Sequence, residues 1–210
     1  MAKSKSRRRK SPGSGTPAPS RGKSGLFGKV TPVKAGIGLV IAGLAVWAVV
    51  DYVDARQGSA AFNELVEHGR PALAKVERLP NDGREHVPDG TIIGYRDDLP
   101  TSGTHSLKWT DPGIYRTQQA PERLVHSLEH GMVVIYYDAP GEEGLKRLGL
   151  WASLFSGEWS GVVLTPKKGL GQAIVLTAWR RRLRLDAFEP ATAAAFIDAY
   201  RGRGPENRVR

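Results

Sequence analysis

Two histidines stand four residues apart in the stretch HSLEHG, which runs from His126 to Gly131. On a helix this spacing places both imidazoles on one face, one turn apart. Imidazole is the most common metal ligand among side chains, but it needs neighbours at fixed spacing to hold an ion. A helix-ending glycine and a strand-like apolar run follow His130 directly. The stretch therefore indicates either a metal site or a well-capped helix end.

Further metal ligands must come from outside this helix. His105 lies upstream in a loop that contains glycine, and it is the natural third ligand after His126 and His130. His86 and Met132 are the candidates for a fourth, and a thioether from Met132 would favour copper. Three histidines with an open position would be typical of a catalytic zinc site, whereas four ligands would be typical of a closed structural one. The predicted cofactor is one copper or zinc ion.

The same histidines also have an interpretation without a metal. A histidine in the last turn of a helix interacts favourably with the helix dipole and can cap the final carbonyls, which is the place of His130. His126 would then be a buried histidine that donates to a backbone carbonyl. Spacing by itself leaves both interpretations open.

The motif also matches H-x-x-E-H, the pattern of inverted zinc peptidases. In those enzymes the two histidines bind zinc and the glutamate, here Glu129, acts as general base. These enzymes share a long active-site helix and a distant carboxylate ligand within a large catalytic domain. Here the predicted helix ends at the second histidine, and the domain is small. The late acidic candidates for the distant ligand are Asp186, Glu189, Asp198 and Glu206.

The elements that must position these residues mix helices and strands without strict alternation. Proline at the first turn and glycine beyond the end predict helices over residues 121–130 and 190–200. A third helix is expected over 142–155 from its apolar face. The predicted strands are 91–95, 132–137, 161–164 and 173–179, with 182–185 as a continuation past a bend. The fold class is therefore α+β, a single small mixed domain with a few-stranded sheet and about three helices.

The positive charge is confined to the first part of the chain. Residues 1–50 carry the whole net charge of +10, because they contain ten Lys or Arg and no acidic residue. The rest of the chain holds 21 basic and 21 acidic residues and is therefore neutral. A nucleic-acid-binding face on the folded domain is therefore not expected. The tail, residues 1–34, is predicted to be disordered. It either attracts anionic inner-leaflet lipid, at about 1 kcal/mol per basic residue, or serves only as a topology signal.

An uncharged apolar run from Ala35 to Val50 follows the tail. Its 16 residues reach roughly 24 Å, and extension to Val53 brings the helix close to the ~30 Å of a hydrocarbon core. We therefore predict a single-pass transmembrane helix over 35–53, with the N-terminus cytoplasmic and the C-terminal domain outside. The alternative is a signal peptide cleaved after Ala55. Both interpretations export the domain to the cell membrane or beyond it, and because the chain has no cysteine, an apolar core must stabilise it.

The predicted domain organisation continues with a stalk or linker over 54–79, in which 55–60 reads as a linker. A broken helix packed on the domain is the alternative for this segment. The exported domain is predicted over 80–205, and 206–210 form a short tail.

Several segments together resemble one known family. The loop that ends in TSGTH at His105, the tripeptide GIY at 113–115, the block LVHSLEHG with its following VVIYY, and a late LTAW carry the likeness. Over roughly residues 86–205 the chain resembles the domain of unknown function 3105 family. Two departures are Thr104, where members usually have proline, and Asp111-Pro112, where members often carry a cysteine.

The resemblance implies an extracytoplasmic domain on an N-terminal anchor, with no established activity. It makes His105, His126, Glu129 and His130 the family-motif positions of this chain. We therefore expect a membrane-anchored module that binds one transition metal ion. An envelope interaction domain with structural histidines is the alternative, and a zinc-dependent hydrolase with Glu129 as base is third. The expected partners are the membrane and the metal ion.

Overall fold

The computed structural model describes Ala48 and residues 56–210. The predicted basic tail, the predicted transmembrane helix except Ala48, and the alternative cleavage point after Ala55 lie outside the described residues. Within the described part of the chain, no helix has the length and apolar character needed to cross a membrane.

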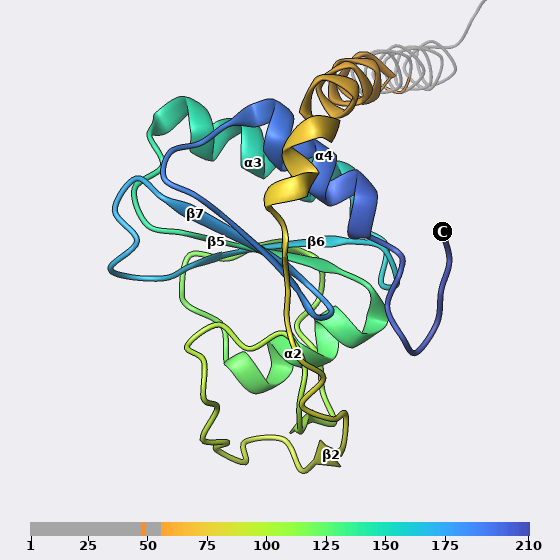
Figure 1. The fold of residues 1–210 in the computed structure, drawn as a ribbon, viewed down its shortest axis with the longest axis vertical. Helices are drawn as coiled ribbons and strands as arrows, with labels where there is room; N and C mark the ends of the chain where they lie inside the picture. Colours follow the sequence, from red (N-terminus) through yellow and green to blue (C-terminus); the bar gives the residue numbers. More distant parts are fainter. Residues whose placement is uncertain (1–47, 49–55) are drawn as a thin grey trace, which may run out of the picture. The chain divides into compact units, whose positions relative to one another are not determined.

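A mixed sheet of six strands forms the centre of the fold (Figure 1), in the order β1-β8-β7-β5-β6-β4. Its strands are β1 (Glu77–Arg78), β4 (Gly113–Ile114), β5 (Val133–Tyr137), β6 (Val162–Pro166), β7 (Ile174–Ala178) and β8 (Arg181–Leu185). β6 runs parallel to β4 and to β5, and the other pairings are antiparallel. The α+β class is confirmed, with a larger sheet than the sequence predicted.

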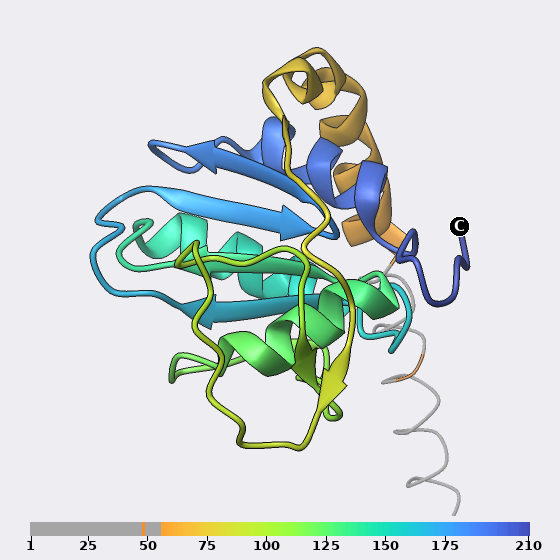
Figure 2. The same cartoon turned by 60° about the horizontal axis from the view of Figure 1, so that its bottom comes forward.

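Helices cover one face of this sheet. They are the helix over residues 56–69, the 3-10 helix η1 (Arg70–Lys75), α3 (Glu142–Leu154) and α4 (Pro190–Tyr200). The opposite face carries α2 (Pro121–His130) and the long irregular segment before it (Figure 2). With residues 56–69 included, the described part contains four α-helices, one more than predicted.

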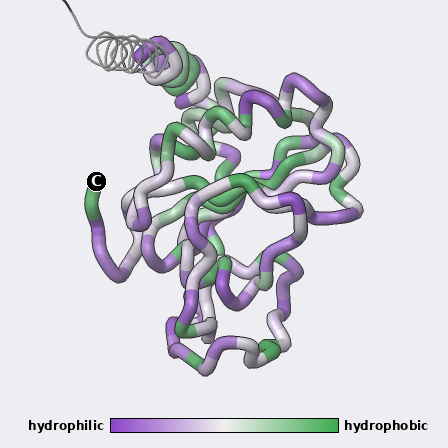
Figure 3. Tube along the Cα trace, turned by 180° about the vertical axis from the view of Figure 1, so that it is seen from behind, coloured by the Kyte–Doolittle hydropathy of each residue, from purple (hydrophilic) through white to green (hydrophobic). Residues whose placement is uncertain are grey.

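Side chains that alternate along the strands form two apolar cores, one on each face of the sheet. Val133 and Ile135 of β5 pack with the helices of one face, whereas Val134 and Tyr136 pack toward α2. This is the two-residue period of a strand. Because both faces are covered, the central strands are almost continuously apolar, as the colouring of Figure 3 shows.

The first described helix belongs to the packed domain. Phe62 and Val66 are buried, and the ring of Phe62 meets Trp151 edge-on with centroids 5.5 Å apart. Gly69 allows the close approach to α4, because a Cβ there would lie 1.9 Å from the carbonyl oxygen of Ala191. Residues 56–60, predicted as part of a linker, are helical and largely exposed, and they extend the helix whose Phe62 and Val66 are anchored in the core.

Two predicted strands also differ from the structure. Residues 91–95 form no strand, and Tyr95 instead donates its hydroxyl to the carbonyl oxygen of Thr104. β8 is a separate strand paired antiparallel with β7, and it does not continue β7 past a bend. Arg180 makes the reversal with a φ of 58°, a conformation that a sequence pattern rarely reveals in a residue other than glycine.

A second, two-stranded sheet lies beside α2. β2 (His86–Val87) pairs parallel with β3 (His105–Ser106), in a register that sets His86 opposite His105. α2 has the predicted bounds: proline occupies its first turn, and Gly131 ends it with a φ of 98°. Every residue of α2 from Leu124 to His130 is buried, so its histidines face protein and not solvent.

Candidate metal centre

Three histidines meet where the small sheet packs on α2. The register of β2 and β3 brings the rings of His86 and His105 to a centroid separation of 4.4 Å. His126, from the middle of α2, lies 4.8 Å from the ring of His86 and 5.0 Å from that of His105. Residues that are distant in sequence therefore share one small volume.

Glu129 completes a group that we call the inner cluster: His86, His105, His126 and Glu129. Nε2 of His105 lies 3.1 Å from Nε2 of His86 and 3.0 Å from Oε2 of Glu129. Nε2 of His86 lies 3.4 Å from the same carboxylate oxygen. Each of the four residues offers one ligand atom, and these atoms all lie within 4.8 Å of one another. This arrangement can hold a metal ion.

Backbone carbonyls fix the tautomers of two of these histidines. Nδ1 of His105 donates to the carbonyl oxygen of Gly103 at 2.8 Å, and Nδ1 of His126 donates to that of Ser106 at 2.7 Å. Because a carbonyl oxygen only accepts, the proton of each neutral ring must be on Nδ1. Nε2 of each ring is then left with a lone pair; metal-binding histidines usually donate their other ring N–H to a carbonyl or carboxylate in this way.

Because the inner cluster is largely buried, a charge within it needs a partner of opposite charge. His105 is 0% exposed and Glu129 is 2% exposed. Burial lowers the pKa of His126, so this ring is neutral at pH 7. A buried carboxylate requires a positive or protonated partner. The guanidinium of Arg84 lies 3.9 Å from Oε1 of Glu129, but the side chain of Arg84 is largely exposed.

A second group, which we call the outer cluster, consists of His126, His130 and Glu206. Nε2 of His130 lies 3.3 Å from Oε2 of Glu206. Burial lowers the pKa of His130 to about 4, so this ring is also neutral at pH 7. Its Nδ1 is buried and has no hydrogen-bond partner among the described residues. Trp159 stacks on the ring at 4.1 Å, and Trp109 lies at 4.6 Å.

The chain after α4 brings Glu206 to this place. Gly202 donates its N–H to the carbonyl oxygen of Gly131 at 2.7 Å, and Glu206 donates to that of Glu129 at 3.4 Å. A Cβ on Gly204 would lie 2.1 Å from the carbonyl oxygen of Glu129. The segment therefore lies against the end of α2 only because residue 204 has no side chain.

Replacing Gly204 with alanine is expected to displace this segment and to lower the free energy of unfolding by about 1–3 kcal/mol, since the new methyl meets rigid backbone. Chemical denaturation followed by far-UV circular dichroism would measure the change. Gly94→Ala is the matched control, because a Cβ at Gly94 meets nothing within 4 Å. Equal stability of the two variants would contradict the close packing at Gly204.

Polar contacts tie the irregular segment to α2 around the clusters. Asp89 receives two hydrogen bonds from the guanidinium of Arg123, at 2.8 and 2.6 Å, and one from Ser106 at 3.0 Å. The hydrogen bond from Arg123 holds the pKa of Asp89 well below its usual range. Oγ of Ser127 donates to the carbonyl oxygen of Thr110 at 2.7 Å. These contacts hold β2 and β3 against the face of α2 that carries the histidines.

Comparison with protein families assigns the chain. The family model described as protein of unknown function (DUF3105) matches residues 86–210. The chain belongs to this family. The DUF3105 match includes every residue of both clusters, and it extends through 206–210, the predicted short tail. No curated protein and no solved structure matches the chain.

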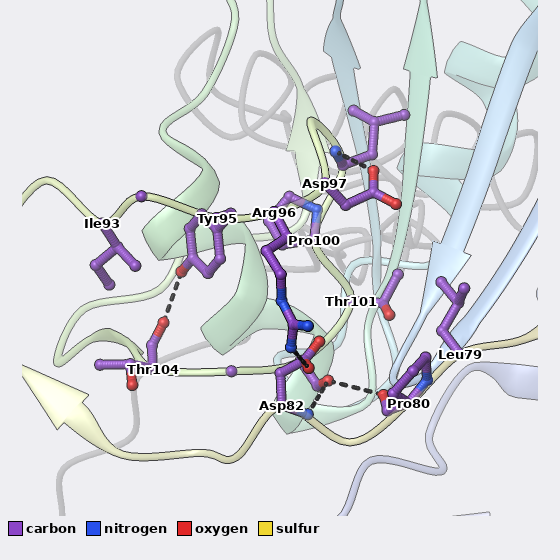
Figure 4. Close-up of a pocket in the computed structure, with 14 residues that line it drawn as sticks. Leu79, Pro80, Asp82, Ile93, Tyr95, Arg96, Asp97, Pro100, Thr101 and Thr104 are labelled. Atoms are coloured by element: carbon purple, nitrogen blue, oxygen red, sulfur yellow. Dashed lines mark hydrogen bonds and ion pairs between the residues drawn. The ribbon is translucent and has the colours of Figure 1, made fainter.

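A separate hollow is lined by residues from the segments 79–82 and 93–104 (Figure 4). In this hollow Arg96 reaches Asp82 at 2.9 Å, and the hydroxyl of Tyr95 donates to Thr104. Its wall includes Gly103, whose carbonyl oxygen holds His105. The hollow therefore shares part of its wall with the loop that orients His105.

His105 and His126 lie together in the inner cluster with His86, the predicted fourth ligand, while His130 lies in the outer cluster. Met132 is fully buried in the apolar core between α2 and the sheet. Glu129, which the sequence suggested only as a base, is a candidate ligand, and its place one turn from His126 was the available signal. Glu206 was identified only as one of several late acidic residues.

Proposed function

We propose that this protein is a metal-binding module that holds one copper or zinc ion through His86, His105, His126 and Glu129. The observation that carries the proposal is the fixed direction of the imidazoles. Backbone carbonyls accept the Nδ1 protons of His105 and His126, so two Nε2 lone pairs are directed into a space that also contains a buried carboxylate.

With neutral imidazoles and an ionised Glu129, these contacts are poorly satisfied. With its proton on Nδ1, His105 faces the carboxylate of Glu129 at 3.0 Å with a lone pair, and two atoms that only accept repel each other. His86 can supply one proton, but its Nε2 lies 3.1 Å from His105 and 3.4 Å from Glu129, so a single N–H must serve both. A metal ion would accept all of these lone pairs at once.

The donor set supports copper or zinc. Imidazole nitrogens suit both metals, and a single carboxylate oxygen is a common further ligand of zinc. The chain contains no cysteine, so no thiolate contributes. Metal entry is expected through a shallow hollow that residues of both clusters line, among them His86, whose side chain is 36% exposed.

The decisive experiment is metal analysis of the full chain, purified in detergent without a polyhistidine tag and loaded with copper or zinc. We expect one ion per chain. Glu129→Gln should weaken binding about tenfold or more, because it removes the only carboxylate of the inner cluster. Glu158→Gln is a matched control on an exposed carboxylate. A metal-free protein after loading would refute the proposal.

If the histidines are only structural, as in an envelope interaction domain, the results differ. No ion would bind, and removal of the imidazole of His105 would lower the stability of the metal-free protein by about 1–3 kcal/mol through a lost buried hydrogen bond.

One observation favours a second candidate, zinc-dependent hydrolysis. The two histidines of H-x-x-E-H and a distant carboxylate, Glu206, lie together as they would in a zinc peptidase. The carboxylate of Glu129 contacts His105 and His86. This position does not suit a base that would act on water bound at the outer cluster. Peptide hydrolysis by the zinc-loaded protein that is lost in Glu129→Gln would support the enzyme, and undiminished hydrolysis would exclude this base.

We further propose that the domain is anchored in the cell membrane and faces the outside, as the charge asymmetry before residue 35 supports. Because the chain lacks cysteine, single cysteines can be introduced cleanly. A membrane-impermeant maleimide should label Ser156→Cys in intact cells and should label Ser4→Cys only after lysis. The reverse pattern would refute this topology.

A further inference from the structure

The outer cluster shares a ligand with the inner one. His126 belongs to both groups, and its ring lies 4.8 Å from His86 and 4.7 Å from His130. Since Nδ1 of His126 donates to Ser106, only Nε2 can bind a metal. His126 can therefore serve one cluster at a time.

We infer that His126, His130 and Glu206 form an entry position for the metal ion, from which His126 passes the ion to the inner cluster. The inference rests on the proposed function, because it names the route to the same site. It predicts one ion per chain that occupies two positions in turn, and not two ions bound together.

An independent feature of His130 supports a ligand at the outer cluster. Its side chain is 3% exposed, and Nδ1 has no hydrogen-bond partner among the described residues. If the ring proton is on Nδ1, the lone pair of Nε2 faces the carboxylate of Glu206 at 3.3 Å. If it is on Nε2, a buried lone pair is left on Nδ1. The protein satisfies neither tautomer, whereas a bound cation would use the free lone pair.

Glu206 is the most exposed of the candidate ligands; His86 of the inner cluster is 36% exposed, and the remaining candidate ligands of both clusters are buried. The side chain of Glu206 is 43% exposed, and His105 at the other end is 0% exposed. Residues of both clusters line one continuous hollow together with Trp109, Trp159 and Glu158. A hydrated cation would therefore meet the carboxylate of Glu206 first and would lose its water stepwise toward His105.

Tryptophans beside His130 provide a direct signal. Trp159 stacks on its ring at 4.1 Å and 20°, and Trp109 lies at 4.6 Å. Copper(II) at the outer cluster would quench their fluorescence. Stopped-flow mixing of the full-length metal-free protein with copper(II) sulfate would therefore follow entry, and elemental analysis would give the final content.

We expect Glu206→Gln to slow copper loading at least tenfold while the final content stays at one ion per chain. Glu158→Gln, a carboxylate on the same hollow that belongs to neither cluster, should change the rate less than twofold. Comparing these two variants separates coordination of the metal by Glu206 from the general attraction of a cation to negative charge. Both residues are well exposed, so both variants should fold.

A second set of variants isolates the outer position. With His86→Gln and Glu129→Gln combined, the outer cluster should still bind one copper ion, at least tenfold more weakly than the unaltered protein. Adding Glu206→Gln should abolish this residual binding. Residual binding that persists in the triple variant would overturn the inference.

The outcomes distinguish this inference from the proposed function. If the unaltered protein binds no ion, both fail. If it binds one ion and Glu206→Gln loads as fast as Glu158→Gln, only the entry position is refuted. Two ions bound together would refute transfer through a shared His126.

Discussion

Replacing His126 with asparagine is expected to lower the affinity for copper(II) or zinc about a hundredfold or more, equivalent to ~3 kcal/mol of binding free energy. His126 is the one residue common to the inner and outer clusters, so its loss disables both positions. Calorimetric titration in competition with a chelator would measure the affinity.

Asparagine suits this test because its amide can still donate to the carbonyl oxygen of Ser106, as Nδ1 of His126 does at 2.7 Å. The fold should therefore survive while the metal ligand is lost. His68→Asn is the matched control, since His68 is exposed on the helix over 56–69 and belongs to neither cluster. Unchanged affinity in His126→Asn would exclude both clusters as the binding site.

The metal-free protein is expected to lose about 3 kcal/mol of stability between pH 6.5 and pH 4 through His130 alone. Burial lowers the pKa of this ring to about 4. Between the two pH values the unfolded chain therefore binds a proton that the folded chain does not. Stability rises with pH wherever the unfolded state binds more protons. The contribution of the neutral His130 is therefore fully present above about pH 6.5 and is lost as the pH drops toward 4.

Urea unfolding in the presence of a chelator, repeated from pH 7 to pH 4, would measure this loss. Carboxylates also titrate near pH 4, so the informative quantity is the difference from His130→Asn, which has no ring to protonate. The variant should show a shallower decline across the same range. Parallel curves for the two proteins would mean that His130 is not held neutral by burial.

Local signals in the sequence predicted α2 correctly. Proline at position 121 and glycine at position 131 act on neighbouring backbone, and the helix has the predicted bounds. The period of the helix likewise predicts that His126, Glu129 and His130 share one face. The β-branched runs predicted β5, β6 and β7 to within a residue or two at each end.

Features that depend on distant pairing were missed or left open. The sequence contains no signal for the register that sets His86 opposite His105, since β2 and β3 have only two residues each. It also could not choose Glu206 among the late acidic residues. That choice depends on Gly202 and Gly204 meeting the end of α2 backbone to backbone, a contact with no local pattern.

The sequence by itself determined the family, the α+β class and the histidine-bearing helix with both its ends. It did so because each rests on residues that act within a few positions of one another. The tertiary structure alone decided that the candidate ligands form two overlapping clusters joined at His126. The physical reason is that ligand geometry depends on the packing of β2, β3, α2 and the C-terminal segment, which no single stretch of the chain encodes.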